Sequence, residues 1–282
     1  MQDDFFGDAT NQTIEKNEPL VELGQEKFSA PIPKSTDLSR SFVFEETEDT
    51  TTKEVFTIYG GKGDGKTSAA FAFPGNIACL SYDRKSLQPK KFLYSNDPRI
   101  RVYDAIKFLD DDPDKLLDSC YKTYLYNIFL LENIAKDKPD WVVIDGLEIY
   151  SEIGEMVMRK RNGLKAFQGV ANMNVWKDRK LLLKNLHIKA MNACKKGVIY
   201  TTYSTEEQVV RDGVIIESKK VPKYVGIVMY ETDYVLRAEG EQTKDGKKFY
   251  LYVASSKNNN RLKDGSRFDI TGKMMPLGEV EK

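Results

Sequence analysis

One short stretch carries residue types and a spacing that suit phosphate binding. Residues 60–68 read GGKGDGKTS, and this matches the pattern G-x-x-x-x-G-K-[ST]. Glycines let the backbone turn tightly, so that its N–H groups can face phosphate oxygens. The lysine can reach the β- and γ-phosphates, and the threonine hydroxyl can bind Mg²⁺. The stretch predicts a nucleotide-binding loop made of Gly60, Gly61, Lys62, Gly63, Asp64, Gly65, Lys66, Thr67 and Ser68.

The residues on either side of this loop support the prediction. An apolar strand over residues 55–59 precedes it, and a run of small residues suited to a helix follows it. The simpler interpretation, a glycine-rich turn that binds nothing, does not require these flanks. The second position of the loop is Gly61 and not lysine, which argues against the partitioning-ATPase variant.

A carboxylate follows a second apolar strand downstream. Residues 141–144 read WVVI and Asp145 comes next. A continuous apolar run of this kind is typical of a buried parallel strand. A carboxylate at the end of such a strand can hold Mg²⁺ together with a loop threonine. The sequence therefore predicts a metal site formed by Thr67 and Asp145, the alternative being an aspartate that only caps a turn.

Hydrolysis of a nucleotide also needs a group that orients or deprotonates the attacking water. Three carboxylates follow predicted strands, and we rank Asp83 first, Glu148 second and Asp104 third. Thr202, near the end of the last core strand, is the expected sensor of the γ-phosphate. The predicted catalytic set is therefore Lys66, Asp83, Glu148 and Thr202.

The elements that must position these residues alternate between strands and helices. The pattern predicts strands at 41–46, 55–59, 77–82, 101–103, 141–145 and 198–203, with helices at 113–136, 151–161 and 175–195. Hairpins are expected around Asp212-Gly213 and Asp245-Gly246. The predicted fold class is α/β, a mainly parallel sheet sandwiched by helices with a C-terminal antiparallel β extension.

The first forty residues differ from the rest in composition. Residues 1–40 are rich in acidic, amide and proline residues and lack periodicity, so we expect a mostly disordered acidic tail before one domain at 41–282. The tip of the tail mixes acids with Phe5 and Phe6 and is a candidate for protein docking. An ordinary solubilising tail is the alternative.

Composition excludes several classes of protein. No apolar run is long enough to cross a bilayer, and the start of the chain lacks the features of a signal peptide. We therefore expect a cytoplasmic protein without a membrane partner. The cysteines at 79, 120 and 194 are odd in number and widely spaced, which favours buried thiols over a disulfide frame or a metal site. The only histidine, His187, is expected to pack within a helix.

The zero net charge of the chain conceals an uneven distribution. Residues 1–50 are strongly acidic, so the remainder carries an equal excess of basic residues. The stretch 156–196 has eleven Lys or Arg residues against one acid, Asp178. Such asymmetry predicts a polyanionic partner for the basic region.

Four motifs in order resemble a known family. The loop at 60–67, the segments SYD at 81–83 and WVVIDGLE at 141–148, and the strand VIYTTY at 198–203 resemble the core of RecA-like ATPases, above all short phage-encoded proteins of single-strand annealing or recombination. The resemblance covers residues 53–272. It implies ATP and Mg²⁺ as cofactors, single-stranded DNA and further copies of the chain in a ring or filament as partners, and a viral or mobile-element origin. It also implies that strand 198–203 lies between the two motif-bearing strands, which would bring Thr202 to the γ-phosphate.

The resemblance also suggests where DNA binds and where the chain departs from its family. Segments after the two later strands face DNA in that family, and here they carry Arg159, Lys160, Arg161, Lys165, Phe167, Lys219, Lys220 and Lys223. A solvated helix face is the alternative for these residues. In place of the family's catalytic glutamate the chain has Asp83-Arg84-Lys85, which predicts slow hydrolysis. A non-hydrolysing nucleotide-gated adaptor therefore remains a competing interpretation, and a small-molecule kinase that uses the same glycine-rich loop is another.

Overall fold

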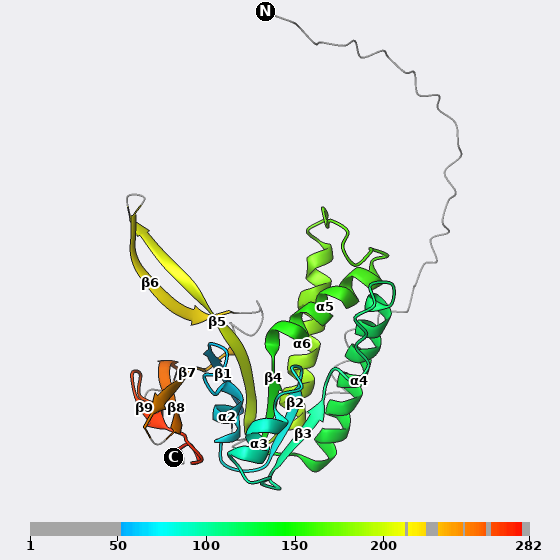
Figure 1. Ribbon diagram of the computed structural model, residues 1–282. Coiled ribbons are helices and arrows are strands. Elements are labelled where there is room, and N and C mark those ends of the chain that lie inside the picture. Colours follow the sequence, from blue (N-terminus) through cyan, green and yellow to red (C-terminus); the bar gives the residue numbers. More distant parts are fainter. Residues whose placement is uncertain (1–51, 212–213, 224–230, 245, 258–260, 278–282) are drawn as a thin grey trace, which may run out of the picture. The chain divides into compact units, whose positions relative to one another are not determined.

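The computed structural model describes residues 52–211, 214–223, 231–244, 246–257 and 261–277 (Figure 1). The predicted acidic tail, the predicted boundary at residue 40 and the predicted strand at 41–46 lie outside these ranges. The turn residues Asp212, Gly213 and Asp245 also lie outside them.

One nine-stranded sheet organises the described residues. Its order is β3-β2-β4-β5-β1-β7-β8-β9, and β6 pairs with β5 outside this path. The strands are β1 (Glu54–Gly60), β2 (Ile77–Ser81), β3 (Ile100–Asp104), β4 (Trp141–Asp145), β5 (Gly197–Arg211), β6 (Val214–Pro222), β7 (Tyr234–Thr243), β8 (Gly246–Ser256) and β9 (Arg267–Asp269). In this spatial order, the neighbouring strands of β3-β2-β4-β5-β1-β7 pair in parallel. The neighbouring strands of β7-β8-β9 pair antiparallel. The predicted fold class is confirmed.

Strand β5 lies between the strand of the glycine-rich loop and the strand of Asp145, as the family resemblance implied. It pairs in parallel with β1 on one side and with β4 on the other. In this register Thr201 is level with Asp145, and Thr202 is level with Tyr59 just before the loop. The carboxyl ends of β1 and β4 therefore lie at one edge of the sheet, beside Thr201 and Thr202 of the longer strand β5.

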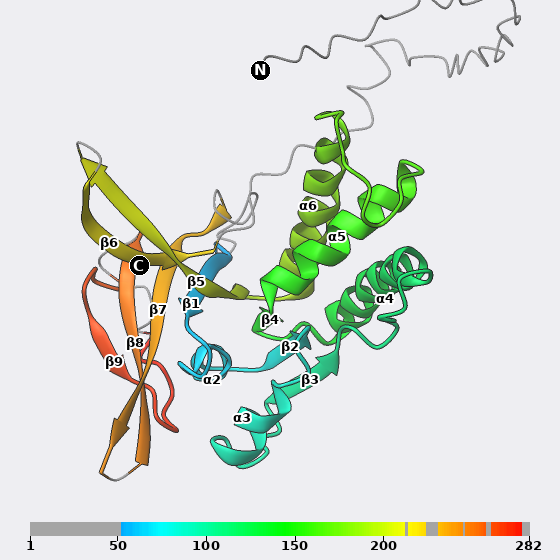
Figure 2. The same ribbon diagram turned by 45° about the horizontal axis from the view of Figure 1, so that its top comes forward.

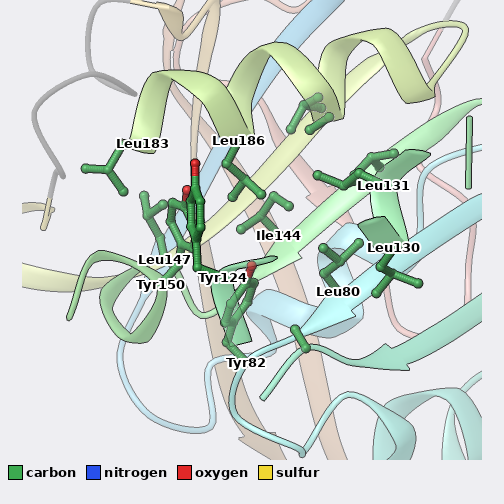
Figure 3. Close-up of a cluster of buried hydrophobic side chains, with 14 of the residues drawn as sticks. Leu80, Tyr82, Tyr124, Leu130, Leu131, Ile144, Leu147, Tyr150, Leu183 and Leu186 are labelled. Atoms are coloured by element: carbon green, nitrogen blue, oxygen red, sulfur yellow. The ribbon is translucent and has the colours of Figure 1, made fainter. Parts of the chain in front are cut away.

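The helices among the described residues are α2 (Lys66–Phe71), α3 (Leu87–Phe92), α4 (Leu116–Asp137), α5 (Leu147–Arg161) and α6 (Val175–Ala193). Alternate residues of β4 face the two cores, because side chains alternate across a strand. Ile144 packs with Leu131 of α4 and Leu186 of α6 in one core (Figure 3). Val143 belongs to the other core, together with Phe71 of α2.

Helix α5 starts earlier than the sequence pattern predicted. Gly146 has a left-handed φ of 104° and joins the end of β4 directly to the helix. Only a glycine adopts such a backbone angle at little cost. The early start places Glu148 in the first turn of α5, immediately after Asp145.

Strand β5 continues well past the predicted end at residue 203. Beyond the sheet it pairs only with β6 and forms a two-stranded ribbon that projects away from α4, α5 and α6 in both views (Figures 1 and 2). Opposite charges face each other across the ribbon, because Glu206 is paired with Lys220 and Glu207 with Lys219. Such cross-strand pairs stabilise a ribbon that has no core of its own.

Several predictions about single residues are confirmed. All three cysteines are buried and unpaired. His187 is buried on α6, where its Nδ1 lies 2.7 Å from the hydroxyl of Tyr200. Within the described residues, no helix combines the length and apolar character needed to span a bilayer.

Candidate nucleotide-binding site

The glycine-rich loop has a closed, internally bonded conformation. Gly63 and Gly65 have left-handed φ angles of 83° and 84°. The Asp64 carboxylate accepts a hydrogen bond from the Gly61 N–H at 2.7 Å and closes the loop. A side chain at Gly65 would also collide with the ring of Phe249 from β8. Both the backbone angle and the neighbouring strand therefore require glycine at position 65.

Thr67 and Asp145 are in contact, as the motif spacing predicted. The Thr67 hydroxyl donates to the Asp145 carboxylate at 2.9 Å. A hydroxyl and a carboxylate from these two elements are the oxygen donors that Mg²⁺ takes in P-loop proteins. The residues present therefore fit the metal, with Thr67 and Asp145 as the side chains that would hold it.

Asp145 is buried and receives two further hydroxyl groups. Thr201 donates to it at 2.5 Å and Ser86 at 2.6 Å. Burial raises the pKa of the Asp145 carboxyl, and the neighbouring charge of Asp83 adds to this effect, whereas the three hydrogen bonds oppose it. A carboxylate held in this way is costly to ionise without a cation nearby.

Lys66 folds back on its own loop. Its Nζ donates to the Gly61 carbonyl at 2.8 Å and lies 4.2 Å from the centre of the Tyr203 ring. Burial lowers the pKa of the Lys66 amine, and the charges of Asp145 and Glu148 partly offset this. The ammonium group is therefore held at the site by weak, exchangeable partners.

The two preferred water-activating carboxylates reach the same cavity. Asp83 and Glu148 both line it, whereas Asp104 lies 3.5 Å from Arg84 and does not. Asp83 accepts a hydrogen bond from the Lys85 N–H at 2.9 Å through Oδ1. Glu148 accepts two bonds of 2.5 Å, from the Thr202 hydroxyl and the Tyr203 N–H.

Thr202 occupies a different place from the one expected. It does not line the cavity, and its hydroxyl binds Glu148 and the carbonyl of Lys223 at 2.7 Å. Thr201 and Tyr203 line the cavity instead. The sequence indicated the correct strand end, but a shift of one residue reverses the face of a strand. Thr202 therefore contacts Glu148 and does not line the cavity.

The cavity has room for a nucleotide. Its volume is about 470 Å³, within the range of small-molecule sites. Sequence reasoning missed its second wall, formed by Lys85, Gln88, Pro89, Phe92 and Leu93 around α3 and by Phe249 on β8. Sequence reasoning also missed Ser86, which holds Asp145. The pair of serines at 81 and 86, flanking the predicted Asp83, was the only available signal.

The predicted DNA-binding residues fall into different environments. Arg159 is buried, pairs with Glu155 at 2.8 Å and donates to the Gln168 carbonyl at 2.5 Å. This corrects its prediction as a phosphate contact: its side chain holds the turn 164–168 in place. Lys160 is bound by Asp118 of α4. Arg161 and Lys165 are exposed and make no ion pair within the described ranges.

Phe167 and three further lysines complete this exposed region. The Phe167 side chain is 80% exposed, on a turn closed by the Gln168 side chain. Helix α6 adds Lys177, Lys180 and Lys184, which the sequence reasoning did not single out. Lys219, Lys220 and Lys223 are exposed on the ribbon, but the first two face glutamates across it.

The fold and the site together define a P-loop nucleoside-triphosphatase core. A family model described as the AAA domain matches residues 52–268. The chain therefore belongs to the AAA domain family. Comparison with curated proteins gives no match. Among solved structures, the KaiC-like protein PH0186 of Pyrococcus horikoshii OT3 matches with 15% identity and a TM-score of 0.37, over 77% of this chain and 84% of that chain.

Proposed function

We propose that this protein is a Mg²⁺-dependent ATPase that binds single-stranded DNA and acts in recombination or replication, as a homo-oligomer of viral or mobile-element origin in the host cytoplasm. The observation that carries the enzymatic part is the contact between Thr67 and Asp145 beside a closed phosphate-binding loop. When bound, Mg²⁺ would neutralise phosphate charge and polarise the terminal phosphate.

The other side chains of the cavity have separate roles in binding the nucleotide and orienting the attacking water. Lys66 is free to move from the loop carbonyls to the phosphates, because each partner it leaves is a neutral group. Asp83 is the preferred group to orient the attacking water. Its Oδ2 accepts no hydrogen bond within the described residues, whereas Oε1 of Glu148 accepts hydrogen bonds from Thr202 and Tyr203 of β5. The apolar wall formed by Pro89, Phe92 and Phe249 offers a surface for a base.

The turn at 164–168 supports the DNA-binding part of the proposal. Arg159 fixes this turn from the inside, so that Phe167 is presented to solvent in a defined position. An exposed aromatic ring beside unpaired cations is suited to stack on a base while the cations contact phosphates. Lys165 lines the same small cavity as Phe167, Arg161 is the last residue of α5, and Lys177 and Lys180 lie on the following helix.

Exposed apolar side chains support association with further copies of the chain. Leu125 and Phe129 on α4 are 46% and 63% exposed, and Leu181 on α6 is 64% exposed. Large apolar side chains gathered on helix surfaces commonly mark protein contacts.

Steady-state ATP turnover with and without single-stranded DNA tests the proposal. We expect Mg²⁺-dependent hydrolysis that DNA accelerates. Phosphate transfer to a metabolite would instead establish a kinase. Tight ATP binding without turnover in either condition would establish a nucleotide-gated adaptor, an interpretation that the Asp83-Arg84-Lys85 segment keeps open.

A further inference from the structure

The turn between β2 and α3 is anchored to the predicted metal ligand. The Tyr82 N–H donates to the Asp145 carbonyl at 2.9 Å, and the buried Ser86 hydroxyl donates to the Asp145 carboxylate at 2.6 Å. Between these anchors, Asp83 accepts the Lys85 N–H. The turn therefore has a defined position relative to Asp145, so that its side chains are presented in fixed directions.

The side chains of Arg84, Lys85 and Ser86, three successive residues of this turn, point in different directions. Arg84 has a left-handed φ of 58°, and its guanidinium donates to the Ile106 carbonyl at 3.0 Å, away from the cavity. Ser86 turns inward to Asp145. Lys85, between them, lines the cavity, is exposed and forms no ion pair within the described part of the chain. The turn therefore places an exposed lysine without an ion pair among the described residues at the wall of the nucleotide cavity.

Among the described residues that line the cavity, lysines are the side chains whose positive charge could bind the terminal phosphate. Among the described residues that line it, the cations are Lys62, Lys66 and Lys85, and none is an arginine. Phosphoryl transfer places negative charge on the terminal phosphate oxygens, which a cation outside the P-loop commonly stabilises. Lys85 is the cavity cation outside the loop, on the same turn as Asp83, whose charge acts on both Lys66 and Asp145.

We propose that Lys85 is a catalytic residue that binds the terminal phosphate and stabilises its charge as the bond to the leaving diphosphate breaks. Water adds to the phosphorus and gives one proton to the Asp83 carboxylate, while the bond from the phosphorus to the bridging oxygen breaks and the nucleoside diphosphate leaves with that oxygen. Lys85 donates hydrogen bonds to the terminal phosphate without giving up a proton. The chain thus supplies from its own β2–α3 turn the cation that other P-loop enzymes take from a partner's arginine. This inference rests on the proposed nucleotide function.

The test compares Lys85→Ala with Lys91→Ala. Lys91 is an exposed lysine on α3 that does not line the cavity, so its loss removes the same charge from the same region. Affinities for ADP and for a non-hydrolysable ATP analogue are measured with Mg²⁺, together with kcat and KM for ATP. Thermal melting verifies that both variants are folded, and Lys85→Arg tests whether another cation can act there.

We expect Lys85→Ala to bind the triphosphate analogue about tenfold more weakly, to bind ADP like the parent, and to lose about 100-fold in kcat. Lys91→Ala should match the parent, and Lys85→Arg should recover part of the missing rate. If Lys85→Ala keeps both the preference for the triphosphate and the kcat of Lys91→Ala, the inference is wrong while the proposed function stands. If the parent itself binds neither nucleotide, the proposed function fails and the inference with it.

Discussion

The carboxyl group of Asp145 is buried, which disfavours its charged form. Burial raises its pKa above the ordinary value of 3.8, so the native state holds this proton more tightly than the unfolded chain. The free energy of unfolding therefore falls as the pH rises from about 4 through the raised pKa. Replacement by asparagine removes this titration and keeps the shape of the side chain.

We expect Asp145→Asn to be more stable than the parent at pH 7 and to lose Mg²⁺-dependent turnover by at least about 100-fold. The advantage in stability should shrink as the pH falls toward 4, because the parent carboxyl is then protonated too. Urea unfolding at several pH values measures it. Parallel pH profiles for the two proteins would show that Asp145 is ionised without cost.

Lys66 allows the nucleotide site to be tested independently of folding. Its ammonium group contacts loop carbonyls and the Tyr203 ring, and no ion pair within the described residues depends on it. We expect Lys66→Ala to weaken ATP binding by at least about tenfold while the melting temperature stays within about 2 °C. Calorimetric titration and thermal melting measure these two quantities. Normal ATP binding in a folded Lys66→Ala protein would remove the phosphate-binding role from the loop.

At the scale of elements, the turn after α5 depends on a residue that sequence reasoning placed in solvent. We expect Arg159→Ala to cost about 3 kcal/mol of unfolding free energy, because it leaves the partly buried Glu155 carboxylate without its closest cation. Arg161→Ala, two residues on and exposed, should change stability by less than about 0.5 kcal/mol. Each variant loses one positive charge, and denaturant unfolding measures the unfolding free energy of both. An equal loss in the two variants would contradict the structural role of Arg159.

The same turn gives a test of DNA binding that separates stacking from charge. We expect Phe167→Ala to weaken single-stranded DNA binding by about 1–3 kcal/mol without changing its salt dependence. Removing Arg161, Lys165, Lys177 and Lys180 together should reduce the slope of log K against log salt by about 0.7 for each phosphate that the protein no longer neutralises. Fluorescence anisotropy across a salt series measures both effects. A quadruple variant with the parent's affinity and slope would identify this face as solvated surface only.

The elements show which parts of the structure could be read from the sequence. The parallel strands and the phosphate loop were predictable, because apolar runs and glycine spacing are local signals. The ribbon was predicted only in part, since residues 204–208 are polar and have no strand pattern until β6 pairs with them. In the sequence, Arg159 cannot be distinguished from the exposed residues Lys160 and Arg161. The pattern of charges does not show which side of a helix end packs against the rest of the protein. The anchoring of Asp145 by Ser86 depends on β2 pairing with β4, which no local signal reports.

At the scale of the whole molecule, we expect the uneven charge to affect the proposed binding of DNA. Residues 1–50 contain 12 acidic and 4 basic residues, a net charge of −8, and because the full chain is neutral the rest carries +8. We expect a variant that starts at Thr50 to bind single-stranded DNA about tenfold more tightly than the full chain at low salt. The difference should disappear near 1 M salt, where charges are screened within about 3 Å.

A matched control identifies charge as the cause. A full-length variant in which asparagine and glutamine replace the acids of residues 1–49 should bind like the shortened variant at low salt. If it binds like the parent instead, the sequence of those residues matters and not their charge.

Strand β5 runs from the centre of the sheet into the ribbon, where its register against β6 shifts between Val209 and Val210. Glu148 holds the strand at Thr202 and Tyr203, beside Lys66 and Asp145. From Tyr203 to Arg211 a strand extends about 26 Å at its usual rise of about 3.3 Å per residue. A tilt of about 10° at Tyr203 would therefore carry the end of the ribbon about 4.6 Å, close to the spacing between neighbouring strands. We therefore expect a small displacement of β5 at Glu148 to produce a larger displacement at the far end of the ribbon.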